Sequence, residues 1–272
     1  MKWFSFEFLV ICTGKYGDIP AIPKFPQNKG PEIFKGKVLH TLDYCKLSED
    51  ESTQLLKGKK VVIFGYKKSA IDLAVECAEA NQGTFFSEAD KGKIVFKRSS
   101  KWWFSEGGVH FEDGSSLEAE VVVLATGFDG KQKLKSIIPD PFRSLLEFPS
   151  GSMPLYRGTI NPLIPNMAFV GYIESVSNLH TAEIRCKWLS RLADEEFKLP
   201  SMEKMLDQTT QEMEIMKRST RFYKRSCIST FSINHTDEIC KEMGWNSWRK
   251  NNWISEAFTP YNSRDYNEEE KK

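Results

Sequence analysis

The sequence predicts an α/β fold, and three segments support that prediction. Two apolar runs, 6–14 and 119–127, each end in a small residue followed by Thr-Gly. This ending is typical of a buried strand that stops where a small backbone must approach a ligand or another chain. Between them, 60–80 has the pattern of a strand, a glycine turn and a helix. In nucleotide-binding α/β folds such a strand–turn–helix opens a unit that a strand of the first kind closes.

The two predicted strands, with their similar sequences, therefore predict two Rossmann-like nucleotide-binding units. The second strand has its opening element at 60–80, whereas the first begins within six residues of Met1. We expect the first unit to have lost its opening strand, turn and helix. On this reading the chain is the remnant of a protein with two dinucleotide-binding domains.

The first elements follow in order along the chain. Residues 15–31 are rich in proline and predict a linker, and 34–40 predict a short extended segment. Residues 60–64 form a β-prone apolar run that Gly65 interrupts. The helix predicted over 69–80 has an apolar face made by Ala70, Leu73, Ala74 and Cys77.

The middle of the chain predicts extended structure over 84–114, broken by Gly and Asp. Residues 109–112 and 117–124, joined by 113–116, predict a hairpin. A parallel crossover takes about 30 residues, so 81–125 leaves room for at most one more. The nucleotide-binding half-fold is therefore predicted to be shortened as well.

The carboxyl-terminal half predicts a helical region. A proline-rich loop over 139–165 leads to a short buried strand at 167–171, and helices are predicted at 179–192, 201–216 and 236–243. The polar tail 262–272 predicts disorder. The predicted domains are 1–57 (residual strand of the first domain and linker), 58–127 (shortened nucleotide-binding domain) and 128–272 (return to the first domain, then helices).

Composition narrows the class of protein. The chain has 272 residues and 40% hydrophobic content, enough for one large core or two modest ones, and its net charge of +1 gives no reason to expect nucleic acid or an anionic membrane. The 6 cysteines are widely spaced without a CxxC pair, which favours reduced thiols and a cytoplasmic location. No stretch reaches the roughly 18 apolar residues of a membrane span.

The turn from Gly65 to Ala70 occupies the place of a G-x-G-x-x-A/G phosphate loop. Gly65 permits the tight turn and Ala70 the close packing of helix on strand, while the amides of Lys68, Ser69 and Ala70, with the Ser69 hydroxyl, could hold a pyrophosphate. Lys67 stands in place of the second glycine and brings both charge and bulk. The alternative is an ordinary strand–turn–helix without a ligand. Glu88 is a candidate for a ribose contact about 20 residues further on.

Other polar positions allow two interpretations each. His40 invites a catalytic role, but a packed or hydrogen-bonded structural histidine is the commoner case. Thr126 and Gly127 either shape the backbone or contact a ligand. Ser175 and Asn178 precede a predicted helix, where Asn178 would serve equally as a simple N-cap. Trp102 to Phe104 would be an aromatic platform or core packing.

The spacing Phe34-x-Gly36-x-x-x-His40-x-x-x-Tyr44 before a glycine turn resembles the fingerprint of flavin-containing monooxygenases. Over nearly the whole chain further motifs match in order. Cys12-Thr13-Gly14 resembles the first interdomain turn of that family, 124–128 its F-A-T-G-Y motif and 183–188 its E-x-Q-A-R-W helix. The turn at 65–70, with Val75-Glu76-Cys77-Ala78, looks most like plant members.

This resemblance implies FAD and NADPH as cofactors and an N,N-dimethylaniline monooxygenase-like activity. NADPH would reduce the flavin, O2 would add at its C4a position, and the hydroperoxide would oxygenate the nitrogen or sulfur of a small amine or sulfide. No catalytic side chain and no metal are implied. The implied cofactor-binding positions are Gly65, Lys67, Lys68, Ser69, Ala70, Thr13, Gly14, Thr126, Gly127, Ser175 and Asn178.

The chain departs from the family pattern in three ways. The FAD-binding G-x-G-x-x-G unit is missing, Lys67 replaces a glycine, and the segment after the first helix of the NADPH domain is absent. That segment carries the basic residue for the 2′-phosphate in relatives, which Lys97 or Arg98 would have to replace. The alternative prediction is a catalytically inactive truncated remnant that does not bind FAD, or an interaction module that pairs with an intact relative.

Overall fold

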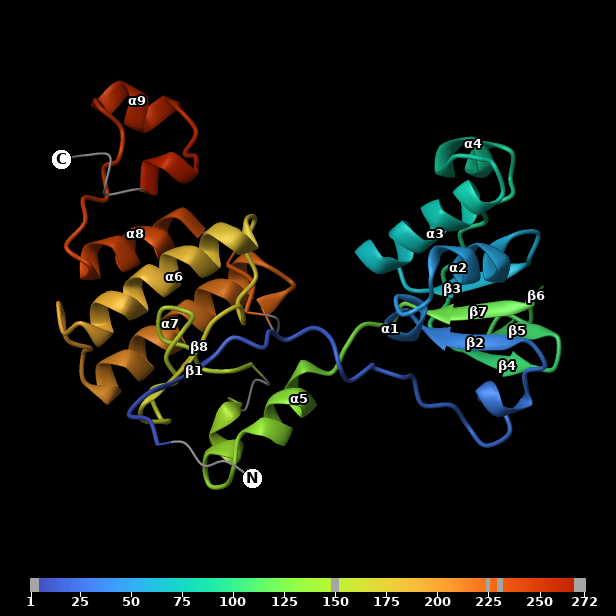
Figure 1. Cartoon of the computed structure of the whole chain (residues 1–272), viewed down its shortest axis with the longest axis horizontal. Coiled ribbons are helices and arrows are strands. Elements are labelled where there is room, and N and C mark those ends of the chain that lie inside the picture. The colour runs from blue at the N-terminus through green and yellow to red at the C-terminus, as the bar shows by residue number, and fades with distance from the viewer. Residues whose placement is uncertain (1–4, 148–151, 224–225, 229–231, 267–272) are drawn as a thin grey trace. The chain divides into compact units, whose positions relative to one another are not determined.

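The computed structural model describes residues 5–147, 152–223, 226–228 and 232–266. The chain divides into two compact units, which are described separately (Figure 1). Unit 1 comprises Met1–Lys15 and Leu134–Lys272, and unit 2 comprises Tyr16–Lys133. No helix among the described residues has both the length and the apolar character to span a bilayer.

Unit 2 is built on a three-stranded parallel sheet in the order β2 (Lys37–His40), β7 (Val121–Leu124) and β3 (Val61–Phe64). A second, antiparallel sheet has the order β4 (Trp102–Ser105), β5 (Gly108–Phe111) and β6 (Ser116–Glu118). The helices are η1 (Pro31–Ile33), α1 (Thr41–Tyr44), α2 (Glu49–Leu56), α3 (Lys68–Ala80) and α4 (Phe85–Asp90).

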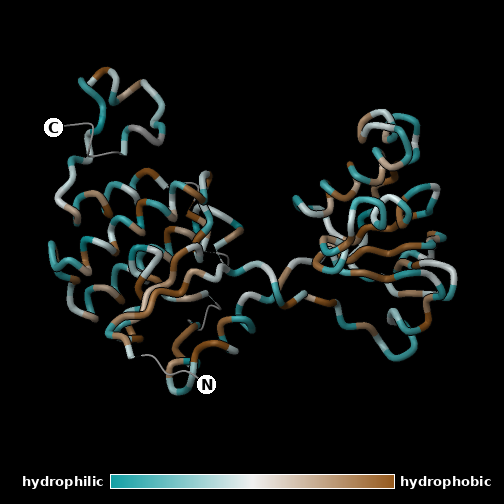
Figure 2. The backbone as a smooth tube through the Cα atoms, in the orientation of Figure 1, coloured by the Kyte–Doolittle hydropathy of each residue, from teal (hydrophilic) through white to brown (hydrophobic). Residues whose placement is uncertain are grey.

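The central strand β7 organises the core of unit 2, because all four of its residues are buried. Val122 and Leu124 pack with Phe104 and other residues of the antiparallel sheet, and Val121 and Val123 pack with Leu73 of α3 and with residues around α1 and α2. The apolar strands stand out between polar helix surfaces in Figure 2. Each buried valine or leucine contributes about 1.5–3 kcal/mol, so β7 is a principal source of the stability of this unit.

Unit 1 pairs β1 (Leu9–Ile11) in parallel with β8 (Met167–Phe169) in a two-stranded sheet. The helix α5 (Gly130–Ile137) runs across the boundary between the units, and η2 (Phe142–Leu146) follows. The remaining helices are α6 (Asn178–Ala193), α7 (Met202–Ser219), α8 (Ser232–Glu242), α9 (Trp253–Phe258) and η5 (Ser263–Tyr266).

A buried ionic network joins the loop after η2 to α6, α7 and α8. Arg157 Nε pairs with Glu242 at 2.8 Å, and Arg185 Nε donates to the Arg157 carbonyl at 2.9 Å. Arg185 Nη2 lies 2.9 Å from His235 Nδ1, and His235 Nε2 lies 3.3 Å from Glu212. Desolvation lowers the pKa of Arg185 to about 9 and also lowers the pKa of His235. Charge and hydrogen bonds therefore fix these elements to one another.

Several predicted elements are confirmed. The strand, turn and helix at 60–80 appear as β3 and α3, the short strand at 167–171 as β8, and the helices at 179–192 and 201–216 as α6 and α7. Trp102 stacks on Phe64 with ring centroids 3.3 Å apart, which is the core-packing alternative. The prediction of disorder for the tail 262–272 is wrong for 263–266, which form η5, and 267–272 lie outside the described residues.

Two further predictions of local structure are wrong. Residues 84–114 are not extended throughout, because the Thr84 side chain accepts a hydrogen bond from the Ser87 amide and begins α4. The run 117–124 is not one hairpin strand. It divides into the exposed β6, which pairs with β5, and the buried β7, which crosses to the parallel sheet.

The compact units have other boundaries than the predicted domains 1–57, 58–127 and 128–272. Residues 37–40 form β2 and pair with β7, so this part of the predicted linker belongs to the sheet of unit 2. Which cofactor each unit serves stays a prediction.

Candidate cofactor-binding site

The glycine turn lies where β3 ends beside the end of β7. The Ala125 amide donates to the Phe64 carbonyl at 2.8 Å, which holds the two chains together. Gly65 has φ +146°, and a Cβ built on it would lie 2.5 Å from the Ala125 carbonyl oxygen. Both the backbone angle and the close approach therefore require glycine at position 65.

Lys67 is tolerated at the second glycine position of the motif. Its φ of −97° and ψ of −173° are extended values that any residue adopts. Lys67 is the N-cap of α3 and makes no side-chain capping bond, and among the described residues no group accepts from the amides of Lys68 or Ser69. Gly65 to Ser69 are exposed, and Ala70 is buried under the helix. The first turn of α3 therefore presents open amides to an anion.

Thr126 and Gly127 follow β7 at the same end of the sheet. The Thr126 hydroxyl donates to the Ala21 carbonyl at 2.7 Å, and the Ala21 amide donates to the Gly127 carbonyl at 2.9 Å. Gly127 has φ +87°. These contacts tie the segment around residue 21 to the sheet, which is the backbone-shaping alternative of the sequence analysis.

His40 ends β2 opposite Leu124 and is 3% exposed. Its Nδ1 accepts from the Leu42 amide at 3.1 Å, so the neutral ring carries its proton on Nε2. That Nε2 is buried and makes no hydrogen bond of normal geometry to any described residue. Desolvation lowers the pKa of His40, although the Gly127 backbone partly opposes this. The His40 ring is therefore buried and neutral, and it lies beside the Gly127 backbone on the strand next to β7.

In unit 1 the structure brings the other predicted positions together. The Thr13 hydroxyl lies 2.9 Å from the Tyr172 hydroxyl, and Lys15 pairs with Glu174 at 3.0 Å. Next to Glu174, the Ser175 amide donates to the Asn178 side chain at 2.9 Å. The N-cap of α6 is Ser177, so Asn178 does not cap the helix as the alternative proposed. Thr13, Gly14, Ser175 and Asn178 therefore belong to one region.

Glu88 is not available for a ribose. The residue is 6% exposed, and its two carboxylate oxygens pair with Lys91 at 2.8 Å and Lys93 at 2.7 Å. Hydrogen bonds from these lysines lower its pKa. Lys97 is also engaged, because it pairs with Asp113 and lies over the Phe111 ring.

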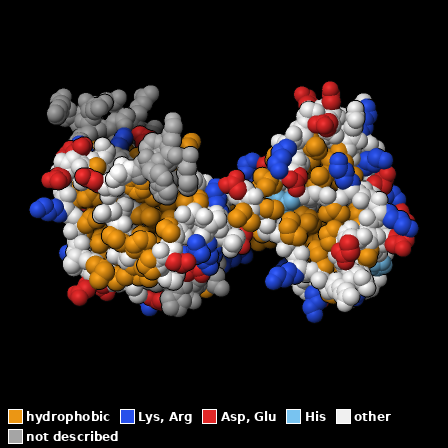
Figure 3. All heavy atoms as spheres, turned by 60° about the horizontal axis from the view of Figure 1, so that its bottom comes forward, with side chains coloured by type: hydrophobic (Ala, Val, Ile, Leu, Met, Phe, Trp, Pro, Cys, Tyr) orange, Lys and Arg blue, Asp and Glu red, His pale blue; other side chains and the backbone are white. Residues whose placement is uncertain are grey.

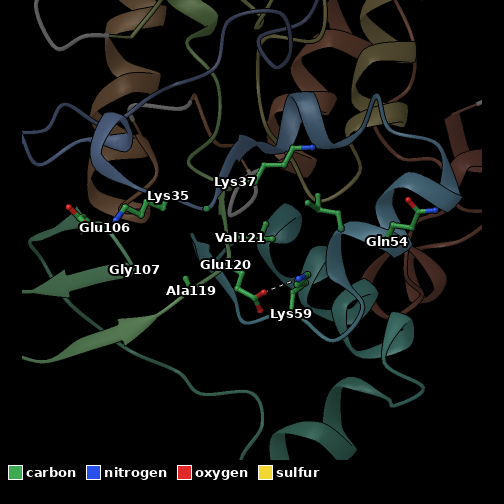
Figure 4. A pocket seen from close by; sticks show the side chains of 11 residues that line it. Lys35, Lys37, Gln54, Lys59, Glu106, Gly107, Ala119, Glu120 and Val121 are labelled. Carbon is green, nitrogen blue, oxygen red and sulfur yellow. Dashed lines mark hydrogen bonds and ion pairs between the residues drawn. The ribbon is translucent and has the colours of Figure 1, made fainter.

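A cavity of about 650 Å³ lies at the other end of the parallel sheet (Figure 4). Its lining includes Lys37 and Val121, the first residues of β2 and β7, and two ion pairs, Lys35 with Glu106 and Lys59 with Glu120. Ligands of open α/β sheets bind at the carboxyl ends of the strands. This cavity is therefore not the nucleotide site.

Comparison with known proteins identifies the family. The family model for flavin-binding monooxygenase-like proteins matches residues 2–105 and 91–249. The chain belongs to this family.

Two relatives from Arabidopsis thaliana are similar over most of the chain. Probable flavin-containing monooxygenase 1 is 48% identical over 368 residues, with 98% of this chain and 69% of the relative covered. Putative flavin-containing monooxygenase 2 is 49% identical over 307 residues, with 89% and 67% covered. Both alignments are longer than the 272 residues of this chain, so part of each lies opposite gaps in it. The family match is likewise in two pieces, which overlap over 91–105, from the end of α4 through β4.

Solved structures show the same fold. The crystal structure of Tmm from Pelagibacter sp. strain HTCC7211 matches with a TM-score of 0.60 at 17% identity, and S-allyl-L-cysteine S-oxygenase from Allium sativum matches with 0.56 at 20%. Each match covers 87% of this chain but only 52% and 54% of the solved chains. The chain thus spans about half the length of these structures.

The cofactors of the family are FAD and NADPH. The residues of unit 2 fit NADPH at the glycine turn, where Gly65 to Ser69 are exposed and the first amides of α3 are open. The described residues of unit 1 fit FAD only in part. They supply 13–14 and 175–178, but β8 reaches α6 through the long connection 170–177 and neither strand leads through a tight glycine turn into a helix.

Proposed function

We propose that unit 2 binds NADPH at the turn from Gly65 to Ala70 and that the chain serves an FAD- and NADPH-dependent monooxygenase. The open amides in the first turn of α3, directly after the glycine turn that ends β3, carry the proposal, because dinucleotides bind at this end of a parallel sheet. The substrate would be a small amine or sulfide that O2 oxygenates at nitrogen or sulfur, as in an N,N-dimethylaniline monooxygenase. Similar proteins named senecionine N-oxygenase and S-allyl-L-cysteine S-oxygenase support oxygenation at nitrogen and at sulfur, respectively.

Each residue of the proposed site has a binding role. The amides of Lys68 and Ser69 receive the pyrophosphate at the positive end of α3, and Lys67 adds a solvent-facing cation. Ala70 lets α3 pack closely on β3. When bound, the flavin supplies the activation of O2. We assign no catalytic side chain, and the cytoplasmic location stays a prediction.

A second candidate is a non-catalytic chain that pairs with an intact relative, and the free edge of β3 favours it. The Lys60 carbonyl accepts from the Glu120 amide and the Phe64 carbonyl from the Ala125 amide, at the two ends of β7. The alternate backbone groups of Val61 and Ile63 therefore point away from β7. Exposed strand edges accept strands from other chains. In unit 1, apolar side chains gather on the face that Figure 3 shows, and Phe6 before β1 is 64% exposed.

Two measurements on the purified chain separate these functions. NADP⁺ should raise the melting temperature of the wild type, and Gly65→Val should abolish this effect because a β-branched residue does not adopt φ +146°. A variant that keeps the stabilisation would move the site elsewhere. A stoichiometric flavin absorbance band with NADPH consumption supports the enzyme. A colourless chain that takes up flavin only when an intact relative is added supports the pairing module.

A further inference from the structure

The part of a dinucleotide that this site recognises can be inferred from the sheet. In a Rossmann-like unit the pyrophosphate lies on the first glycine turn. The 2′ position of the adenosine ribose is read about 20 residues later, by a carboxylate for NADH or by a nearby arginine for NADPH. These readers follow the strand that comes after the first helix and lies beside the first strand.

Unit 2 has no strand at that place. The order β2–β7–β3 leaves β3 at the edge of the sheet, and residues 81–101, all of them described, form only α4 and irregular chain before β4 begins. The strand β4 belongs to the antiparallel sheet instead. The support for a 2′ reader is thus missing from the described structure.

Two charged side chains of this connection, those of Glu88 and Lys97, are already engaged with neighbouring residues. Glu88 pairs with Lys91 and Lys93 and packs against Gly83, where a Cβ would come within 2.5 Å of the Glu88 side chain. Lys97 is held by Asp113 over the face of Phe111. Glu88 therefore cannot accept from a ribose, and Lys97 cannot reach a 2′-phosphate without breaking these contacts.

The groups that would bind the pyrophosphate are exposed. Lys67 is exposed at the N-cap of α3, next to the open amides of Lys68 and Ser69. Lys68 shares its charge with Asp72 at 2.5 Å, whereas no described residue forms an ion pair with Lys67. Positive charge is therefore concentrated at the position of the bridging phosphates, which NADPH and NADH have in common.

From these observations we infer that the site binds the pyrophosphate of the dinucleotide without reading the 2′-phosphate, so that NADPH and NADH bind with nearly equal affinity. The inference rests on the proposed nucleotide site of unit 2. The shortened connection between α3 and β4 accounts for the loss of discrimination, and Lys67 with the first turn of α3 provides the remaining recognition.

Isothermal titration of the full chain with NADP⁺ and with NAD⁺ tests this inference. A charge-assisted hydrogen bond to the 2′-phosphate would appear as at least about a tenfold difference in Kd. Dissociation constants that differ by less than about fivefold support the inference. A larger preference for NADP⁺ overturns it while leaving the proposed function intact. If neither nucleotide binds, the proposed function itself fails and the inference with it.

Variants of two exposed cations, Lys67 and Arg98, make the test more specific. Lys67→Ala should weaken both nucleotides by the same factor, and a loss confined to NADP⁺ would contradict the assignment. Arg98→Ala is the matched control, because Arg98 is an exposed cation of the shortened connection. It should leave both affinities unchanged. A loss of NADP⁺ affinity alone in Arg98→Ala would show that this residue reads the 2′-phosphate, and it would overturn the inference.

Discussion

Replacing Gly65 by alanine tests the geometry of the candidate site most directly. The added methyl must accept φ +146°, which costs about 1–3 kcal/mol, and it must relieve a 2.5 Å contact with the Ala125 carbonyl, which costs about 1–3 kcal/mol more. The total of about 2–6 kcal/mol is a large part of the stability of an ordinary domain. Unit 2 should melt at least about 8 °C lower. Differential scanning calorimetry with and without NADP⁺ measures this change.

Gly107→Ala is the matched control in the same unit. Gly107 lies between β4 and β5, and a Cβ added there meets no atom within 4 Å. This variant should keep the melting temperature and the stabilisation by NADP⁺. If Gly65→Ala has the same melting temperature as Gly107→Ala, the close approach of Gly65 to the Ala125 carbonyl is incorrect. If Gly65→Ala is destabilised but is still stabilised by NADP⁺ as much as wild type, the nucleotide binds elsewhere.

Three further predictions concern single positions. Lys67→Gly should weaken NADP⁺ binding in a titration, because Lys67 sits without strain and supplies charge; a gain in affinity would mean that it obstructs the ligand. Arg157→Met should destabilise unit 1 by about 3–5 kcal/mol in urea unfolding, since it leaves the partly buried Glu242 carboxylate without its cation; a loss below about 1 kcal/mol would contradict this. Because burial lowers the pKa of His235, the unfolded state binds more protons below pH 6.5, and stability should fall as pH drops from 6.5 toward the lower folded pKa. His235→Gln should flatten that part of the pH profile, and an unchanged slope would assign it to other groups.

The sequence predicts those parts of the fold that depend on local pattern. The β-prone run before Gly65 and the apolar face of α3 are local, and both elements form as expected. Two helices that the sequence analysis does not predict, α2 and α4, begin at recognisable caps. Ser48 and Glu51 form a capping box at the start of α2, and Thr84 caps α4. These polar caps are short signals that the surrounding charged residues obscure.

The pairing of strands is a tertiary property that no local pattern determines. The run 117–124 is continuous in hydropathy, yet Leu117 pairs with β5 at the surface and Val121 to Leu124 cross into the buried centre of the parallel sheet. The surroundings of the site residues are also a tertiary property. The sequence predicts the motif around Gly65, but it does not predict the burial of His40 against its neighbours or the pairing of Glu88 with lysines of the following loop.

The shortened connection after α3 links the two proposed properties of unit 2. A strand beside β3 would both pair with the backbone of Val61 and Ile63 and support a reader of the 2′ position. Without it, the same edge is open to a strand from another chain and the site recognises only what lies on the glycine turn. A partner that covers this edge with a strand of its own could therefore restore a preference for NADPH. Measuring the NADP⁺ to NAD⁺ affinity ratio with and without an intact relative tests this coupling, and a ratio that stays constant while a complex forms would show that the partner binds elsewhere.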